Sequence, residues 1–182
     1  MSKISSLILL ICLSPVLLIG AIAIIVDDGF PILFKQKRVG LHNKLFWIYK
    51  FRTMKKDTPD IPTHLVNDGA SLYTFLGPFF RKYSMDELPQ LINILKGDMT
   101  FIGPRPALYN QEDLIDLRSK AGIHHLMPGV TGWAQVNGRD ELSIPDKVKM
   151  DEYYLKNQSF WLNIKILWMT VLKVCKAEGV KK

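Results

Sequence analysis

The sequence predicts a mainly α-helical protein with small β content, in which an N-terminal membrane segment precedes a single polar domain. Three observations support this fold class. Residues 4–26 carry no charged side chain, the apolar residues of later segments mostly recur at helical spacing, and strand-like composition is confined to short stretches. With 182 residues, the chain is long enough for one domain with a hydrophobic core.

Charge is distributed unevenly along the chain. The 24 lysines and arginines exceed the 17 acidic residues and give a net charge of +7, yet Lys3 is the only charged residue before Asp27. An uncharged run followed by a basic domain indicates a membrane together with an anionic surface or a phosphorylated substrate. A nucleic-acid-binding protein fits less well, because the sequence has neither zinc-finger spacing nor a block of like charges.

The cysteines and histidines do not predict a metal site or a disulfide framework. Cys12 and Cys175 are the two cysteines, and neither has a partner at metal-ligand spacing. A reducing, cytosolic environment is therefore expected for the polar domain. His124 and His125 are adjacent, so their side chains diverge, and a surface or loop role is expected for both.

The uncharged run from Ile4 to Val26 would form roughly 34 Å of helix, enough to cross a bilayer. The "AIA" at residues 21–23 resembles a signal-peptide cleavage site, but the apolar run continues past it, so a retained membrane segment is expected. Ser14-Pro15 lies near the middle of the run. A proline there removes one backbone hydrogen bond and should bend the helix sharply.

Two membrane topologies are compatible with this bend. Each half is about 16–18 Å long, too short to cross the hydrocarbon alone. The segment either spans as a kinked helix or dips in and returns to the same face, and in both cases Ser14 can bond the carbonyl that the proline leaves unpaired. Basic residues place the large domain on the cytoplasmic side; they are Lys35, Lys37, Arg38, Lys44 and Lys50.

The next segments give shorter predictions. "LFWIYKF" at residues 45–51 is either a short strand or an interfacial helix turn, since its periodicity fits both. Residues 55–74 are polar and contain prolines and a glycine, which predicts a surface loop. "ELPQLINIL" has helical spacing, and Gly97 suits the end of that helix.

"SMDELPQL", residues 84–91, places two carboxylates side by side, Asp86 and Glu87. Ser84 three residues before Glu87 matches a capping box, and acids suit a helix N-terminus. Pro89 conflicts with a helix that begins at Ser84, because it lacks an N–H. A helix that begins at Asp86 or Glu87 would leave both acids at its mouth, where both can reach one ligand. The local sequence favours a plain helix start over an acid pair kept for chemistry.

"GDMTFIGPRPAL" places Arg105 between two prolines. Pro104 and Pro106 restrict the backbone on both sides, which predicts a stiff loop that presents a guanidinium. A guanidinium held in this way can bind a phosphate with two donors. A surface arginine in a structural turn explains the same pattern equally well.

"PGVTGWAQVNGRD" combines glycines with an aromatic residue, an amide and Arg139. Glycines let the backbone approach a ligand closely, so this segment could hold a nucleotide. The alternative is a β-hairpin that turns at Asn137-Gly138. The local sequence favours the hairpin.

Two further helices are expected towards the C-terminus. Residues 107–126 predict a helix that ends before Pro128. Residues 158–176 mix tryptophan and lysine with aliphatic side chains, which suits a helix at a membrane interface. A core-facing helix explains this second pattern about as well.

Several segments together carry a family resemblance. They are "LSP" in the apolar run, "FKQKRVG" followed by "IYKFRTM", "RKYSMDELPQLINILKGDM", "FIGPRP", "PGVTGWAQVNGR", and "MDEYYLKN" before "WLNIKIL". In content and order they resemble the small monotopic phosphoglycosyl transferases, bacterial sugar transferases that begin glycan assembly on polyprenyl phosphate. The resemblance covers nearly the whole chain.

The resemblance implies a more specific architecture. Residues 1–26 would form a re-entrant membrane helix that breaks at Ser14 and Pro15, with both ends cytoplasmic. Residues 27–182 would form a compact cytosolic catalytic domain with interfacial amphipathic helices, one of them at 158–176. The protein would lie at the bacterial inner membrane, with this domain facing the cytoplasm.

The resemblance also implies a reaction. A sugar-1-phosphate would pass from a UDP-sugar to polyprenyl phosphate, with undecaprenyl phosphate the expected bacterial acceptor, and UMP would be released. Asp86 would be the nucleophile that carries the phosphosugar, and Glu87 would bind Mg²⁺. Three basic residues would bind substrate phosphate, namely Lys50, Arg81 and Arg105. Arg139 would contact the nucleotide, and Asp151 matches an acidic family position without a derivable role.

An inactive homologue that acts as a scaffold in a glycan-assembly complex is the alternative function. The intact acids and arginines argue against it. The expected partners are the UDP-sugar, the prenyl phosphate, membrane lipid and downstream glycosyltransferases, and no nucleic acid.

Overall fold

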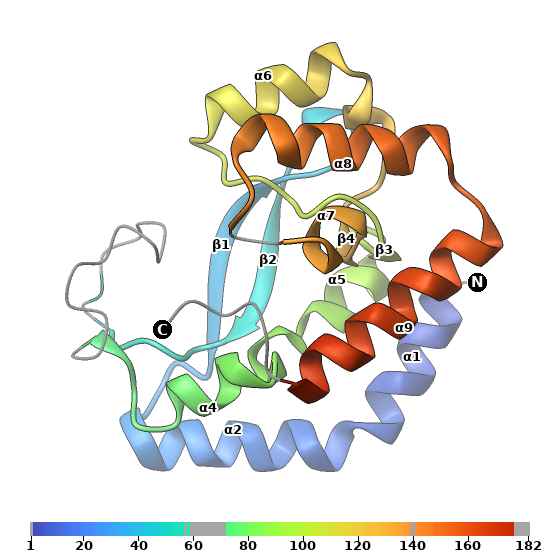
Figure 1. Cartoon of the computed structure of the whole chain (residues 1–182). Helices are drawn as coiled ribbons and strands as arrows, with labels where there is room; N and C mark the ends of the chain where they lie inside the picture. Colours follow the sequence, from blue (N-terminus) through green and yellow to red (C-terminus); the bar gives the residue numbers. More distant parts are fainter. Residues whose placement is uncertain (1, 57, 59–71, 139–140, 177–182) are drawn as a thin grey trace.

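The described part of the chain is mainly helical with two small sheets, which confirms that part of the predicted fold class (Figure 1). The computed structural model describes residues 2–56, 58, 72–138 and 141–176. The helices are α1 (Ser2–Cys12), α2 (Ser14–Asp28), α4 (Gly77–Lys82), α5 (Gln90–Lys96), α6 (Glu112–Lys120), α7 (Trp133–Val136), α8 (Ile144–Lys156) and α9 (Phe160–Lys176). The strands and 3₁₀ turns are β1 (Leu33–Val39), η1 (Leu41–Asn43), β2 (Leu45–Phe51), η3 (Met85–Glu87), β3 (Thr100–Ile102), η4 (Ile123–His125) and β4 (Gly129–Thr131).

The N-terminal apolar run forms two helices, α1 and α2, that meet at a bend of 62°. In Figure 1, α2 lies along the lower edge of the molecule and α1 turns away from it. Pro15 cannot donate to the carbonyl of Ile11, and the Ser14 hydroxyl donates to that carbonyl instead, at 2.7 Å. The predicted bend and the predicted role of Ser14 are both confirmed. Within the described ranges, no single helix is long and apolar enough to cross a bilayer; only the bent pair reaches that length and composition together.

Polar contacts hold this helix pair against the rest of the molecule. The buried hydroxyl of Ser6 donates to the carbonyl of Leu91 in α5 at 2.7 Å. At the other end of the pair, the guanidinium of Arg52 lies 2.8 Å from the carboxylate of Asp28 and also donates to the carbonyl of Gly29 at 2.7 Å. Both ends of the apolar run are therefore fixed to the elements that follow it.

Strands β1 and β2 form an antiparallel hairpin, paired from Leu33↔Phe51 to Val39↔Leu45. The "LFWIYKF" segment is thus a strand, which settles the choice that its periodicity left open. Ile48 faces inward and packs in a buried cluster with Leu91 and Ile94 of α5. This packing places the inner face of β2 beside the acidic turn η3 and the start of α5.

The second sheet pairs β3 and β4 in parallel. A Cβ on either Gly103 or Gly129 would overlap the backbone of the facing segment, so the close pairing requires glycine at both positions. The expected hairpin at Asn137-Gly138 is wrong: β4 ends at Thr131 and α7 follows it at once. Gly129 and Gly132 of this segment serve the close approach to Gly103, the residue after β3.

The C-terminal helices differ in part from the sequence prediction. Helix α6 is shorter than the expected helix at 107–126, because residues 107–111 are not helical and the turn η4 follows α6 separately. Helix α9 buries Ile166 completely, whereas Trp161 and Trp168 are 77% and 64% exposed. One stripe of α9 therefore packs on the core beside Val136 and Tyr154, as the core-facing interpretation expects, while its aromatic side faces outward. Most of the expected surface loop at 55–74 lies outside the described residues.

Candidate active site

The two adjacent acids lie in the short turn η3, before α5 begins. Ser84 has a left-handed backbone, with φ of 53°, and its side chain caps no helix, so the predicted capping box is wrong. Pro89 stands at the N-cap position of α5, where its missing N–H costs nothing. Asp86 and Glu87 are only 7% and 8% exposed. Two buried acids that no helix cap uses fit the second interpretation of this segment, a pair kept for chemistry.

Glu87 joins three segments of the chain. Its Oε1 lies 2.7 Å from Nζ of Lys50 on β2 and 3.0 Å from Nη2 of Arg105 in the loop after β3. The side chains of Glu87 and Lys50 are 9% and 15% exposed and that of Arg105 is 30% exposed, so these contacts are charge-assisted hydrogen bonds that water screens only partly. The sequence-predicted residues Lys50, Glu87 and Arg105 thus come together at one point.

Asp86 lies beside this cluster. Among the residues that the structure describes, no group donates a hydrogen bond to its carboxylate. Burial raises its pKa above the usual 3.8 and the charge of Glu87 adds to the rise, while the cations Lys50, Arg81 and Arg105 oppose it. Asp86 is therefore a buried carboxylate that faces positive charge without being hydrogen-bonded to it.

Lys50 has the opposite response to the same environment. Burial lowers its pKa below 10.5, and the charges of Arg105 and Arg38 lower it further, while Glu87 and Asp86 raise it. Cations outnumber acids around this point, which suits a site that receives additional negative charge.

Arg81 is positioned by a separate set of contacts. It projects from α4, and its Nε donates to Oγ1 of Thr53 at 3.1 Å while Nη1 donates to the hydroxyl of Tyr73 at 3.0 Å. Its guanidinium carbon lies 5.0 Å from the centre of the Tyr73 ring. The side chain is thus held in one orientation, close enough to Asp86 to lower the pKa of that carboxyl.

The loop that carries Arg105 is fixed through its backbone. Nη1 of Arg38 donates to the carbonyl of Pro106 at 3.2 Å, and Nη1 of Arg118 on α6 donates to the carbonyl of Arg105 at 2.7 Å. Two arginines therefore hold the loop from either side.

Asp151 does not contact the acid pair, but it holds Arg118. Its Oδ2 accepts from Nε of Arg118 at 3.0 Å and from Nη2 at 2.5 Å. Burial raises the pKa of Asp151 above 3.8, against the lowering effect of Arg118. A continuous set of contacts runs from Asp151 through Arg118 to the carbonyl of Arg105, whose side chain then reaches Glu87.

Sequence reasoning missed Arg38 and Arg118. Arg38 lies in the matched stretch "FKQKRVG", where it is one of several basic residues, and Arg118 had no local signal. Arg139 lies outside the described residues. Ser14 and Pro15 form the bend between α1 and α2, as expected.

The acid pair fits one kind of magnesium site. Within the described ranges, no group of three or more His, Cys, Asp or Glu side chains could hold a metal. Mg²⁺ is commonly bound by only one or two carboxylates together with substrate phosphate oxygens. Asp86 and Glu87 supply two carboxylates beside three cations that suit phosphate, so these residues would fit a metal that is bound together with a diphosphate.

Comparison with known proteins gives a family and several relatives. Residues 1–177 match the family described as bacterial sugar transferase. The chain is 45% identical to an uncharacterized sugar transferase, EpsL, of Bacillus subtilis, over 96% of this chain and 86% of the relative. It is 38% identical to the undecaprenyl-phosphate glucose phosphotransferase of Komagataeibacter xylinus, and 38% identical to the UDP-glucose:undecaprenyl-phosphate glucose-1-phosphate transferase of Escherichia coli. These two matches cover 92% and 91% of this chain, which spans only 34% and 37% of the relatives' length.

Proposed function

We propose that this chain, which belongs to the bacterial sugar transferase family, transfers a sugar-1-phosphate from a UDP-sugar to polyprenyl phosphate. The names of two relatives give undecaprenyl phosphate as the acceptor, and one of them gives UDP-glucose as the donor. The product would be a polyprenyl-diphosphate sugar, the first membrane-bound intermediate of glycan assembly.

One observation carries the proposal: a buried carboxylate without a hydrogen-bond donor among the described residues faces three cations. None of the described residues forms a direct ion pair with Asp86, so its oxygens remain available to a reacting phosphorus atom. The cations Lys50, Arg81 and Arg105 are placed to bind the charged diphosphate that brings this atom to the site.

The reaction has two steps in this proposal. An Asp86 oxygen attacks the phosphorus that bears the sugar, the bond from that phosphorus to the bridging oxygen breaks, and UMP leaves with the bond electrons. The sugar phosphate is then joined to Asp86 as an acyl phosphate. An oxygen of the prenyl phosphate next attacks the same phosphorus, and the Asp86 carboxylate leaves, which regenerates the enzyme.

The other residues prepare this centre. Lys50 and Arg105 compensate the charge of Glu87 and of incoming phosphate, while Arg81 approaches from the side of α4. Glu87 would hold Mg²⁺, which neutralises charge on the diphosphate when bound. Arg139 would contact the nucleotide. Asp151 is a positioning residue, since it orients Arg118 and thereby the loop of Arg105.

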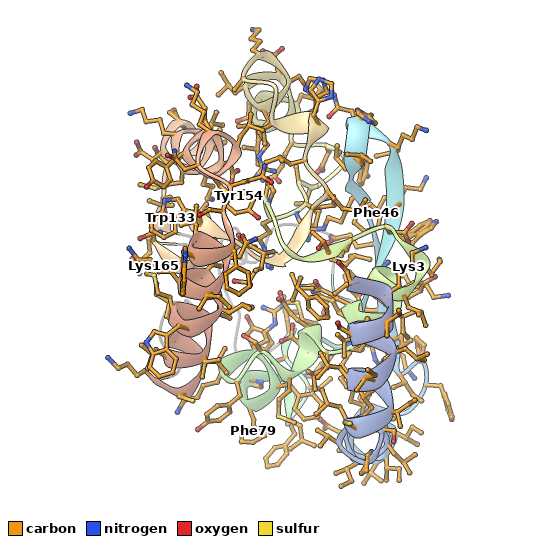
Figure 2. The ribbon with its side chains drawn as sticks, turned by 90° about the vertical axis from the view of Figure 1, so that its right-hand side faces the viewer. Lys3, Phe46, Phe79, Trp133, Tyr154 and Lys165 are labelled. Atoms are coloured by element: carbon orange, nitrogen blue, oxygen red, sulfur yellow. The ribbon has the colours of Figure 1, made fainter. Side chains whose placement is uncertain are left out.

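We further propose that residues 1–26 form a re-entrant membrane helix and that residues 27–182 form a catalytic domain on the cytoplasmic face of the inner membrane. The bent helix pair and its exposed apolar side chains support this placement. So do the exposed Trp161 and Trp168 of α9 and the outward-pointing Phe79, which Figure 2 shows at the lower end of the molecule. Replacing both tryptophans by serine should reduce binding to lipid vesicles, and unchanged cosedimentation would contradict the placement.

The experiment that tests the function is UMP release by purified protein from a panel of UDP-sugars, with undecaprenyl phosphate and Mg²⁺ present and with each omitted. The proposal predicts sustained turnover with at least one sugar, dependent on both additions. An inactive scaffold within a complex that includes downstream glycosyltransferases would release no UMP from any sugar of the panel.

A further inference from the structure

A cavity of about 250 Å³ reaches Glu87, one member of the acid pair. Glu87 and Arg105 form part of its wall, together with residues of α1, α5, β4, α7 and α9. The remaining wall is mainly apolar, with Leu9 from α1, Leu13 at the break between α1 and α2, Leu91 from α5 and Val174 from α9. A charged end and apolar sides require a ligand that combines an anion with a hydrocarbon chain.

The two helices that supply the outer walls of the cavity are also those with exposed apolar faces. Figure 2 shows α9, marked by Lys165, on one side of the molecule and α1, marked by Lys3, on the other. Both helices expose large apolar side chains outside the cavity, among them Ile8 on α1 and Trp168 on α9. A hydrocarbon chain could therefore pass from a lipid phase into the cavity without crossing water.

The charged residues of the cavity wall also suit a ligand that carries a phosphate. Besides Arg105, two lysines line the cavity, Lys82 from α4 and Lys173 from α9. They come from separate elements, so the positive charge surrounds the cavity. A phosphate bound there would lie beside Glu87 and next to the residue proposed as the nucleophile.

We propose that this cavity binds the phosphate-proximal end of the prenyl chain of the acceptor. The inference rests on the proposed function and adds to it the position at which the acceptor binds. Pockets that enclose a whole drug-sized ligand have about 300–1,000 Å³, so a cavity of about 250 Å³ takes only the first part of a long prenyl chain. The rest of the chain stays in the lipid. This arrangement directs the acceptor phosphate at Asp86 from the side of α1 and α9.

The test compares two substitutions on α9. Val174→Trp fills the cavity, whereas Val171→Trp changes the same residue type one turn earlier, at a position that is 53% exposed and not part of the cavity wall. Adduct formation with the UDP-sugar alone and transfer to undecaprenyl phosphate are measured separately. Val174→Trp should form the adduct at the wild-type rate but raise the KM for undecaprenyl phosphate by about tenfold or more, a loss of about 1.4 kcal/mol in binding. Val171→Trp should change neither step.

Two results would overturn the inference. One is that Val174→Trp and Val171→Trp have equal KM values for undecaprenyl phosphate. The other is that Val174→Trp slows adduct formation and transfer equally, which would assign the cavity to the donor sugar. A wild-type protein that forms no adduct would refute the proposed function instead.

A second measurement does not depend on activity. In a Cys12→Ser, Cys175→Ser background, undecaprenyl phosphate should slow modification of Val174→Cys by N-ethylmaleimide and leave Val171→Cys unaffected. Equal rates at both positions would contradict the proposed site.

Discussion

The ion pair between Asp151 and Arg118 gives the sharpest test of how the site is supported. The Asp151 side chain is 1% exposed and that of Arg118 is 11% exposed. Asp151→Asn leaves a buried guanidinium without its counter-charge, and breaking a buried pair in this way costs about 3–5 kcal/mol. For a domain of this size, such a loss corresponds to a fall in Tm of roughly 6–20 °C.

Asp116→Asn is a matched control on the helix that carries Arg118. Asp116 pairs with Lys120 at 2.6 Å, but its side chain is 59% exposed. Removal of an exposed pair should change the free energy of unfolding by less than about 1 kcal/mol. Thermal unfolding of the two variants under one condition measures the difference directly.

A double substitution separates stability from positioning. Replacing a buried ion pair by apolar side chains of similar size removes the desolvation cost of both charges, so an apolar pair should restore stability. Asp151→Leu with Arg118→Met should therefore unfold near the wild-type temperature. It should still form the phosphosugar adduct more slowly, by up to about a hundredfold, because the carbonyl of Arg105 has lost its donor. A double variant with wild-type adduct formation would refute the positioning role, and an Asp151→Asn variant as stable as Asp116→Asn would refute the energetic argument.

Three further predictions concern the acid pair. The rate of adduct formation should follow a bell-shaped pH profile. It should fall at low pH as Asp86 is protonated, with a pKa above the ordinary 3.8, and at high pH as Lys50 loses its proton, with a pKa below the ordinary 10.5. A rate that stays constant from pH 3.8 to pH 10.5 would contradict both pKa shifts. Since burial raises the pKa of Asp86, the ionised carboxylate destabilises the fold. Asp86→Asn should therefore raise Tm at pH 8 more than at pH 5, where the wild-type carboxyl is more protonated in the folded state. A Tm of Asp86→Asn below that of the wild type at pH 8 would show that the cations outweigh burial. Glu87→Gln should need about 10–100-fold more Mg²⁺ for half-maximal turnover as well as lowering the rate, and a titration that superimposes on wild type would exclude Glu87 as a metal ligand.

Local chemistry explains which elements could be predicted from the sequence. The bend at Ser14-Pro15 and the end of α5 at Gly97 each depend on one or two residues with strong backbone preferences. Gly97 adopts a φ of 94°, which glycine tolerates at the end of a helix. Such preferences act within a few residues, so the sequence displays them directly.

The errors have a common cause, which is contact between distant segments. The local sequence of the glycine-rich stretch predicts a hairpin, but Gly129 is needed for its approach to Gly103, the residue after β3. The pairing of Arg118 with Asp151 joins residues 33 positions apart. Neither partner is marked locally, and only the fold shows that together they hold the loop of Arg105.

The candidate site was predicted through family resemblance more than through local pattern. The local sequence favoured a helix start at Asp86-Glu87, and the structure instead buries both acids in a separate turn. Lys50 and Arg105 converge on Glu87 from β2 and from the loop after β3. The composition of the sequence indicates a basic domain, but this convergence depends on the packing of β2 and α5.

The most direct test of the proposed mechanism is intact-mass analysis of the protein after incubation with its UDP-sugar and Mg²⁺, without acceptor. The wild type should gain the mass of one sugar phosphate, with peptide mapping that places it on Asp86, and added undecaprenyl phosphate should remove it. The Asp86→Asn variant should show no increase in mass. A transferring wild type that never carries the adduct, or an Asp86→Asn variant that still releases UMP at the wild-type rate, would contradict the mechanism.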